Sequence, residues 1–428
     1  MSENTQQGAG PGQAAGPGQA ARPQLIRAMN EQLLLSHIRQ LGVCSRADLA
    51  RLSGLSKPTV SLALANVERS GLVRTAGQRT GVPGRSAVLY EIRPDAGYVL
   101  GLDIGHEYLR GAIADLTGEI RAKAEARSPS GSVSRRVGEL IKLADGICAA
   151  AGVGRADVTE TVLGSPGVYD PSRDAIALTG GLAGWDKRAV LERLRSAFGP
   201  NFVVENDTDA AALAEREHGH GREFASFAFV SIGSGIGMGL VLGGQLHRGA
   251  HGVAGEIAFL PITDGLGVVG QPGGPGEDEV RRRGTLEAVG SSSAIVRSAR
   301  YAGLRAASAR QVFAAAAAGD ERAAAIVATE ARLVAKAICS IVTVIDPGLV
   351  VLGGGIGQAP GFAAAVAAEL VAISPVMPEI RVSALGTSAV VDGCLASGAD
   401  LAWSRLTAQV AQPDGQAEVQ AVGAAGAF

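Results

Sequence analysis

The sequence SRADLARLSGLSKPTVSLALANV, residues 45–67, predicts two short helices joined by a tight turn. Ser45 can cap the first helix, and Asp48 three residues later completes a capping box. Gly54 supplies the left-handed residue of the turn, and Val60 fills the space between the two helices. This spacing of cap, glycine and apolar residue predicts a helix-turn-helix.

The second helix of this motif carries the residues expected to face DNA. Ser56 can cap it, and Pro58 is tolerated in its first turn. Its apolar positions recur at helical spacing and predict one buried stripe, formed by Val60, Ala63, Leu64 and Val67. The polar positions on or near the solvent side of the same helix are Lys57, Thr59, Ser61 and Asn66.

A basic hairpin is predicted after this helix. Two short strands, 72–75 and 87–92, flank the basic turn 78–85. Such a hairpin after a helix-turn-helix is typical of the wing of a winged helix-turn-helix, which binds DNA. The alternative is a small helical bundle with a hairpin. The DNA contacts predicted for this domain are Ser45, Arg46, Ser56, Lys57, Thr59, Ser61, Arg79 and Arg85.

Length and charge predict several domains with different partners. The chain has 428 residues and a net charge of −2, but residues 22–95 hold eleven Lys and Arg against five Asp and Glu. A basic segment on an acidic body is typical of a DNA-binding domain attached to a domain that does not contact DNA. We predict a disordered tail at 1–21, a winged helix at 22–95, an α/β domain at 96–406 and a second disordered tail at 407–428.

The cysteines and the hydropathy of the chain indicate the cellular compartment in which the protein is expected. The four cysteines are scattered and form no CxxC pair, which argues against a disulfide framework and a cysteine zinc site. No signal peptide and no apolar run long enough for a membrane span are visible. We therefore expect a cytoplasmic protein without a membrane partner.

From Gly97 onward, apolar strand-like segments alternate with Ala-rich helices, and the early strands are close enough for hairpins. This pattern predicts an α/β domain with a mixed sheet. Three glycine turns follow predicted strands; glycine lets backbone N–H groups approach phosphate oxygens, although tight turns also need it. The residues of these turns are Asp103, Gly105, Gly233, Gly235, Gly237, Gly353 and Gly354.

The polar triplet Glu205-Asn206-Asp207 ends another predicted strand, directly before a helix. Asn206 and Asp207 can simply cap that helix. Alternatively, they bind sugar hydroxyls, with Asp207 placed to accept a proton. Glu256 follows a glycine, and Glu287 lies at the start of a helix. Under the sugar-binding hypothesis, we expect all four of these side chains to converge on one hydroxylated ligand.

Together these motifs resemble the ROK family (repressors, open reading frames and kinases) over about residues 22–405. The resemblance implies an actin-like, two-lobed sugar-kinase fold, preceded by the winged helix of the repressor branch. It implies phosphate loops at 103–105 and 233–239, and nucleotide-side glycines at 353–355. It also implies a sugar site formed by Asn206, Asp207 at the catalytic-base position, Glu256 and Glu287.

Two departures from the family pattern concern ATP and zinc. Kinases of the family have Gly and Thr where this chain has His106 and Glu107, and a carboxylate beside a triphosphate is repulsive. ATP binding is therefore expected to be lost, unless Glu107 points outward from the hairpin. The zinc-binding His of the family is replaced by Phe259, and residues 260–286 contain no Cys or His. We therefore expect neither a metal nor another cofactor.

These features predict a sugar-responsive transcriptional regulator without enzyme activity, a repressor of carbohydrate-uptake or catabolic genes. Its expected partners are a double-stranded DNA operator, a small sugar or sugar-phosphate effector, and further copies of the chain in a homodimer or homotetramer. One alternative is a ROK sugar kinase, which the intact Asp207 and the second glycine loop support. The other is a ligand-independent DNA-binding protein, which the lost His position supports. Activation in place of repression stays open.

Overall fold

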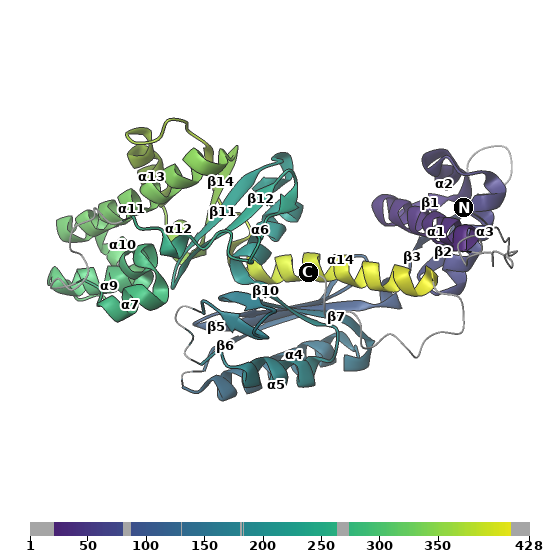
Figure 1. The fold of residues 1–428 in the computed structure, drawn as a ribbon, viewed down its shortest axis with the longest axis horizontal. Helices are drawn as coiled ribbons and strands as arrows, with labels where there is room; N and C mark the ends of the chain where they lie inside the picture. The colour runs from purple at the N-terminus through teal and green to yellow at the C-terminus, as the bar shows by residue number, and fades with distance from the viewer. Residues whose placement is uncertain are drawn as a thin grey trace, which may run out of the picture. The chain divides into compact units, whose positions relative to one another are not determined.

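The computed structural model describes residues 21–79, 87–129, 131–179, 182, 184–262 and 274–411, and these form two compact units (Figure 1). One unit contains the described residues up to Ala96 together with those from Trp403 onward. The other is Gly97–Ala402. Among the described residues, no helix is both long and apolar enough to cross a membrane.

The N-terminal unit has the helix-turn-helix and hairpin predicted from the sequence. Its elements are α1 (Ala21–Leu41), β1 (Val43–Ser45), α2 (Arg46–Ser53), α3 (Lys57–Arg69), β2 (Val73–Arg79) and β3 (Ala87–Ile92). The three strands pair antiparallel in the order β1-β3-β2. The capping box of Ser45 and Asp48 begins α2, and Gly54 ends it with a φ of 69°. Leu49, Val60 and Leu64 are fully buried between the helices.

Asn66 corrects the predicted solvent face of α3. It is 8% exposed, and its side-chain amide donates a 2.6 Å hydrogen bond to the carboxylate of Glu31 on α1. Glu31 is itself buried and accepts a second hydrogen bond from Arg27. The prediction that Asn66 lies on the solvent side is therefore wrong, because its partner belongs to a helix that the period of α3 cannot reveal.

The first lobe of the Gly97–Ala402 unit is built on a mixed sheet, as predicted. Its elements are β4 (Tyr98–Ile104), β5 (Tyr108–Asp115), β6 (Ile120–Arg127), α4 (Val133–Ala151), β7 (Val158–Ser165), β8 (Val168–Asp170), β9 (Ala175–Ala177), α5 (Arg188–Phe198) and β10 (Phe202–Asn206). The strand order is β10-β7-β4-β5-β6, with parallel pairing on the β10 side and antiparallel pairing on the β6 side. Helices α4 and α5 cover one face of this sheet (Figure 1).

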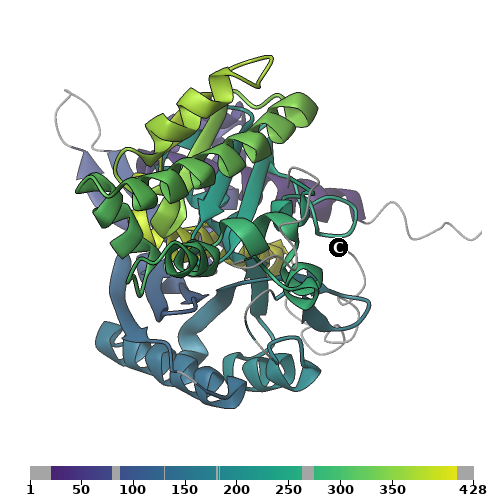
Figure 2. The same cartoon turned by 90° about the vertical axis from the view of Figure 1, so that its left-hand side faces the viewer.

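The second lobe has a five-stranded sheet of its own, in the order β13-β12-β11-β14-β15. Its elements are α6 (Asp207–His218), β11 (Phe227–Ile232), β12 (Ile236–Leu242), β13 (Gln245–Leu246), α7 (Glu277–Arg283), α8 (Thr285–Gly290), α9 (Ser292–Tyr301), α10 (Ala309–Ala317), α11 (Glu321–Ile345), β14 (Leu349–Gly353), α12 (Gly354–Gly357), α13 (Phe362–Val371) and β15 (Glu379–Val382). The helices α9, α10, α11 and α13 form a layer over the sheet (Figure 2). The two sheets give the unit its two-lobed α/β fold.

The last helix, α14 (Ala389–Ala411), takes part in both units. Its first half packs on the first sheet, where the thiol of Cys394 lies 3.5 Å from the carbonyl oxygen of Leu102, and Gly393 packs against Ala210 of α6. Trp403, in its second half, packs under the guanidinium of Arg39 at 5.4 Å. The helix extends past residue 405, so the tail predicted to begin at 407 is helical as far as 411.

Candidate functional site

The predicted DNA contacts on α3 lie at its N-terminal end. Ser56 caps the helix, accepting a hydrogen bond from the backbone N–H of Thr59, and the two hydroxyls are 2.8 Å apart. Ser56 and Lys57 are exposed, whereas Thr59 and Ser61 are half-buried. One turn of α3 therefore offers a cation and hydroxyl groups to a partner.

The other predicted DNA contacts differ in their exposure and in the interactions that they already make. Ser45 is 4% exposed, and its hydroxyl is committed to the capping box with Asp48 rather than to DNA. Arg46 is exposed and lies over the ring of Tyr90 at 5.3 Å. Arg79 is also exposed, with its guanidinium 3.7 Å from the carboxylate of Asp48. Arg85 lies outside the described residues.

Four carboxyl groups come together in the Gly97–Ala402 unit; we call Asp103, Asp207, Glu256 and Glu287 the acidic cluster. Burial raises the pKa of Asp103 to about 7, and the charge of Asp207 contributes. Burial, followed by the charges of Asp207 and Glu287, raises the pKa of Glu256 to about 7. Burial likewise raises the pKa of Asp207 to about 6, with a further contribution from Glu287. The charge of Asp207 thus acts on Asp103 and Glu256, and that of Glu287 acts on Asp207 and Glu256, so groups from four separate segments share one electrostatic environment.

Asn206 has a structural role. Its carbonyl oxygen accepts hydrogen bonds from the backbone N–H groups of Thr208 and Asp209, so it caps α6. Its amide nitrogen donates to the carbonyl oxygen of Gly167 at 3.1 Å, which ties the cap to the first lobe. The helix-cap interpretation of Asn206 therefore holds. It does not conflict with sugar binding by Asp207, the first residue of the helix.

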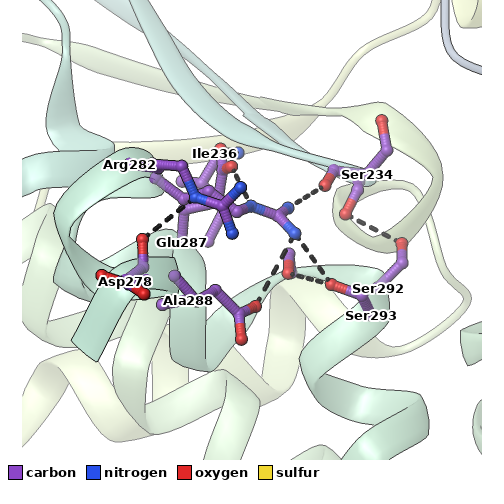
Figure 3. Close-up of polar contacts among 12 residues, drawn as sticks. Ser234, Ile236, Asp278, Arg282, Glu287, Ala288, Ser292 and Ser293 are labelled. Atoms are coloured by element: carbon purple, nitrogen blue, oxygen red, sulfur yellow. Dashed lines mark hydrogen bonds and ion pairs between the residues drawn. The ribbon is translucent and has the colours of Figure 1, made fainter. Parts of the chain in front are cut away.

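Glu287 is held in place by the second glycine loop and by an arginine. Its carboxylate accepts the backbone N–H of Ile236 at 2.9 Å and the Nε–H of Arg283 at 2.7 Å (Figure 3). Arg283 also donates to the carbonyl oxygen of Ser234 at 2.7 Å and to the hydroxyl of Ser293 at 3.1 Å (Figure 3). The arginine therefore fixes the carboxylate and the loop relative to each other.

Replacing Arg283 with Ala should destabilise the protein by about 1–3 kcal/mol, because Glu287 then stays buried with one hydrogen bond fewer. Arg282→Ala is the matched control, since Arg282 is exposed and its Nε–H donates to the backbone oxygen of Asp278 at 3.1 Å. Urea denaturation of both variants measures the difference. Equal free energies of unfolding would show that Arg283 does not hold this network.

The sequence did not single out Asp209 and Arg248, which lie beside the acidic cluster. Asp209 is 5% exposed, and burial, then the charge of Glu205, raises its pKa to about 8. Arg248 binds both carboxylate oxygens of Glu205, at 3.3 and 2.5 Å. Asp209 could have been found from its place in the first turn after the polar triplet. Arg248 carries no local signal, because its partner is 43 residues away.

The glycines of the loops differ in how much space surrounds them. A side chain at Gly235 would meet the carboxylate of Glu287 at 2.8 Å, so this glycine is required by packing. A side chain at Gly355 would meet nothing within 4 Å, and one at Gly233 would first meet the backbone nitrogen of Gly355 at 3.6 Å. The space beside Gly233 and Gly355 is not filled by side chains, so a ligand could approach the backbone there closely.

His106 and Glu107, the two residues of the first glycine turn that depart from the family pattern, differ in their exposure. Glu107 is exposed, and its carbonyl oxygen accepts a hydrogen bond from the backbone N–H of Ser128. His106 is half-buried, and its pKa is lowered by burial and by the charges of Arg136 and Arg283. The exposure of Glu107 favours the alternative in which its carboxylate points away from a bound phosphate. Repulsion by Glu107 is thus a weaker argument against ATP than the sequence suggested.

The residues present do not fit the zinc site that the family resemblance implies. Phe259 stands at the His position and is 40% exposed. Within the described ranges, no three His, Cys, Asp or Glu side chains are grouped so that they could hold a metal ion.

The chain is similar to known proteins of two kinds, repressors and sugar kinases. The sequence model of the ROK family matches residues 99–397. The chain is 26% identical to the xylose repressor of Bacillus spizizenii over 237 residues, which are 55% of this chain and 61% of the repressor. It is 30% identical to the N-acetylmannosamine kinase of Shigella flexneri over 274 residues, 63% of this chain and 86% of the kinase.

The chain spans about three fifths of the length of the curated xylose repressors it matches. Among solved structures, a ROK family transcriptional regulator, described as a homologue of the E. coli MLC protein, superposes with a TM-score of 0.70. The match covers 90% of this chain and 99% of that chain, at 23% identity. At this identity, the likeness concerns the fold.

Proposed function

Because the chain belongs to the ROK family, we propose that it is a sugar-responsive DNA-binding transcriptional regulator that represses genes of carbohydrate uptake or catabolism. The observation that carries this proposal is the presence, in one chain, of an exposed helix-turn-helix and a buried acidic cluster. The first suits a DNA duplex, and the second suits the hydroxyl groups of a sugar. Similarity to named xylose repressors supports the combination.

The acidic cluster would bind a sugar through hydroxyl-to-carboxylate hydrogen bonds. Asp207, at the start of α6, and Glu256 supply the acceptors, while Arg283 keeps Glu287 in position. Hydrogen bonds to a charged group contribute about 1.5–3 kcal/mol each, which is enough for two or three of them to select a sugar. The sugar can change DNA binding only by its different affinity for two conformations of the protein.

Helix α14 offers a physical connection between sugar binding and DNA binding. Gly393 packs against Ala210 of α6, the helix that begins at Asp207. The end of α14 belongs to the winged-helix unit, where Trp403 packs under Arg39. A shift of α6 on sugar binding would therefore displace a helix that is shared with the DNA-binding unit. In a homodimer or homotetramer, this displacement would change the spacing of two winged helices on an operator.

Two measurements test the function. Operator DNA selected from a random duplex library should bind the protein in gel-shift titrations. Xylose, N-acetylmannosamine or another sugar from a thermal-shift panel should raise the melting temperature and release that DNA. A protein that binds DNA but responds to no sugar would be the ligand-independent regulator. A protein that binds no duplex from the library would contradict the proposal.

A sugar kinase is the second candidate, and the 30% identity to N-acetylmannosamine kinase favours it. A carboxylate with a pKa of about 6, such as Asp207, suits a catalytic base. We nevertheless propose that the chain is not an enzyme and needs no ATP, because Glu107 stands where the kinases have Thr and therefore lacks the hydroxyl that donates a hydrogen bond to the phosphate. Sustained transfer of the γ-phosphoryl group from ATP to a sugar of the panel, giving ADP and a sugar phosphate, would show that the chain is a kinase.

Sugar affinity should rise with pH between about 5 and about 8, because an ionised carboxylate accepts hydrogen bonds more strongly than a neutral one. Asp207 and Glu256 ionise in this range, with pKa values of about 6 and about 7. The gain should be roughly fivefold for each group, which calorimetric titration can measure. The stability of the ligand-free protein should change in the opposite sense. Both pKa values exceed those of the unfolded chain, so these two groups lower stability as the pH rises from about 4 to about 7. A sugar affinity that is independent of pH would contradict the role of both groups.

The purified protein should contain no stoichiometric zinc, because Phe259 and the absence of Cys and His from 260–286 remove the family's ligands. Chelation with EDTA should leave its melting temperature unchanged. Elemental analysis gives the answer directly. About one zinc ion per chain would require a ligand set that includes other histidines.

A further inference from the structure

A cavity of about 350 Å³ lies in the second lobe, between α9 and α11 and beside the end of α8. Its walls are mainly apolar and include Ile295, Ile326 and Leu333. Arg322 and Thr329 also line it, but both are engaged elsewhere: Arg322 with Asp320 at 3.0 Å and Thr329 with the carbonyl oxygen of Ala325 at 2.9 Å. The volume is that of a site for a small organic molecule.

One carboxyl group of this cavity has no visible structural purpose. Glu330 on α11 is 2% exposed, and within the described part of the chain it makes neither a hydrogen bond nor an ion pair. Oε1 is completely buried, and a side chain added at Gly290 would lie 3.3 Å from it. Burial alone raises the pKa of Glu330 well above its usual range, so no charged group compensates it.

An uncompensated carboxyl group is costly in an apolar core. Glu330 lies among buried apolar positions of α11, such as Val334 and Ile338. A leucine or methionine would cover the same surface without that cost. The group is therefore explained more readily by a partner that enters the cavity than by packing.

We propose that this cavity binds a small organic amine, with the ammonium group on the carboxylate of Glu330 and the apolar part against Ile295, Ile326 and Leu333. An ammonium ion supplies the opposite charge as well as N–H donors, so it compensates the buried carboxylate. A hydroxyl group supplies one donor and no charge. This site is separate from the acidic cluster and does not depend on the proposed function.

The protonation chemistry gives the site a distinctive pH dependence. Burial raises the pKa of Glu330 and favours its neutral form, whereas an ammonium ion favours the carboxylate, so amine binding is coupled to release of the carboxyl proton. Amine affinity therefore rises with pH up to the pKa of the free Glu330 carboxyl. Arg322, the other charged residue that lines the cavity, is paired with Asp320.

Calorimetric titration of the full chain with benzylamine, and with benzyl alcohol as the neutral isostere, tests the proposal. Benzylamine should bind at least about tenfold more tightly than benzyl alcohol, and Glu330→Gln should remove that difference. Glu321→Gln is the matched control, because Glu321 is an exposed glutamate on the same helix. Ala325→Trp, which fills the exposed mouth of the cavity, should weaken binding of both probes.

Three results would overturn the amine site. Equal affinities for benzylamine and benzyl alcohol would show that Glu330 does not select a cation. Unchanged benzylamine binding in both Glu330→Gln and Ala325→Trp would place the amine elsewhere. Absence of benzylamine binding, with an Ala325→Trp variant that elutes as a smaller oligomer than the parent, would assign the cavity to contact with a second copy of the chain.

Discussion

The Asp207→Asn, Glu256→Gln double variant should lose sugar-induced release of operator DNA while keeping its affinity for that DNA. Both substitutions remove the charge of a carboxylate in the acidic cluster but keep its shape. A hydrogen bond to a charged group is stronger than one to a neutral group by about 1 kcal/mol, so the pair should account for about 2 kcal/mol. The sugar concentration that releases half of the DNA should therefore rise by about 25-fold.

Gel-shift titration with increasing sugar measures this effect, and calorimetry of sugar binding shows that its cause is lost affinity. The matched control is Asp186→Asn, Glu277→Gln, which removes two exposed carboxylates from the same unit. The variants should also be slightly more stable than the parent, because the two carboxylates repel each other. A full sugar response in the double variant would refute the assignment of the acidic cluster.

The Lys57→Ala, Thr59→Ala double variant should bind operator DNA about tenfold more weakly than the parent. Lys57 is exposed at the start of α3, where a helix that enters the major groove contacts phosphate and base edges. If Lys57 contacts a phosphate, the slope of log affinity against log salt should fall by about one. The sugar affinity should not change.

Ser56 remains in this variant, so the cap of α3 is kept and the winged helix should still fold. Lys142→Ala serves as the control, because Lys142 is an exposed lysine of the Gly97–Ala402 unit and is paired with Glu139 at 2.9 Å. Titrations at several salt concentrations separate a phosphate contact from a general loss of charge. Undiminished binding by the α3 variant would move the DNA interface away from this helix.

Local sequence signals gave the helix-turn-helix with little error. Ser45 with Asp48, and Ser56 with Thr59, are pairs three residues apart, and each acts on the first turn of a helix. Gly54 adopts the left-handed conformation that ends α2, as its place in the motif predicts. Interactions of this range are complete within a few residues, so neighbouring residues in the sequence are sufficient to predict them.

Side chains whose partners lie far away in the sequence were not predictable in this way. Asn66 has the position of a solvent residue in the period of α3, but Glu31 of α1 makes it part of the core. Nothing in the sequence distinguishes Arg248 from the other arginines, and only the fold shows that it binds Glu205. A helical or strand period describes which face a residue occupies. It contains no information about which polar group of another element packs against that face.

The sequence by itself determined the helix-turn-helix, the glycine turns and the mixed α/β pattern, because these depend on residue type and short spacing. The candidates Asp207, Glu256 and Glu287 also came from the sequence, through its resemblance to the ROK family. Only the tertiary structure decided that burial and neighbouring carboxyl charges raise the pKa of Asp103, Asp207 and Glu256, and that Arg283 ties Glu287 to Ser234. It also revealed Glu330 beside a cavity. Electrostatic coupling and burial depend on distance in space, and chain folding brings together groups that no local pattern connects.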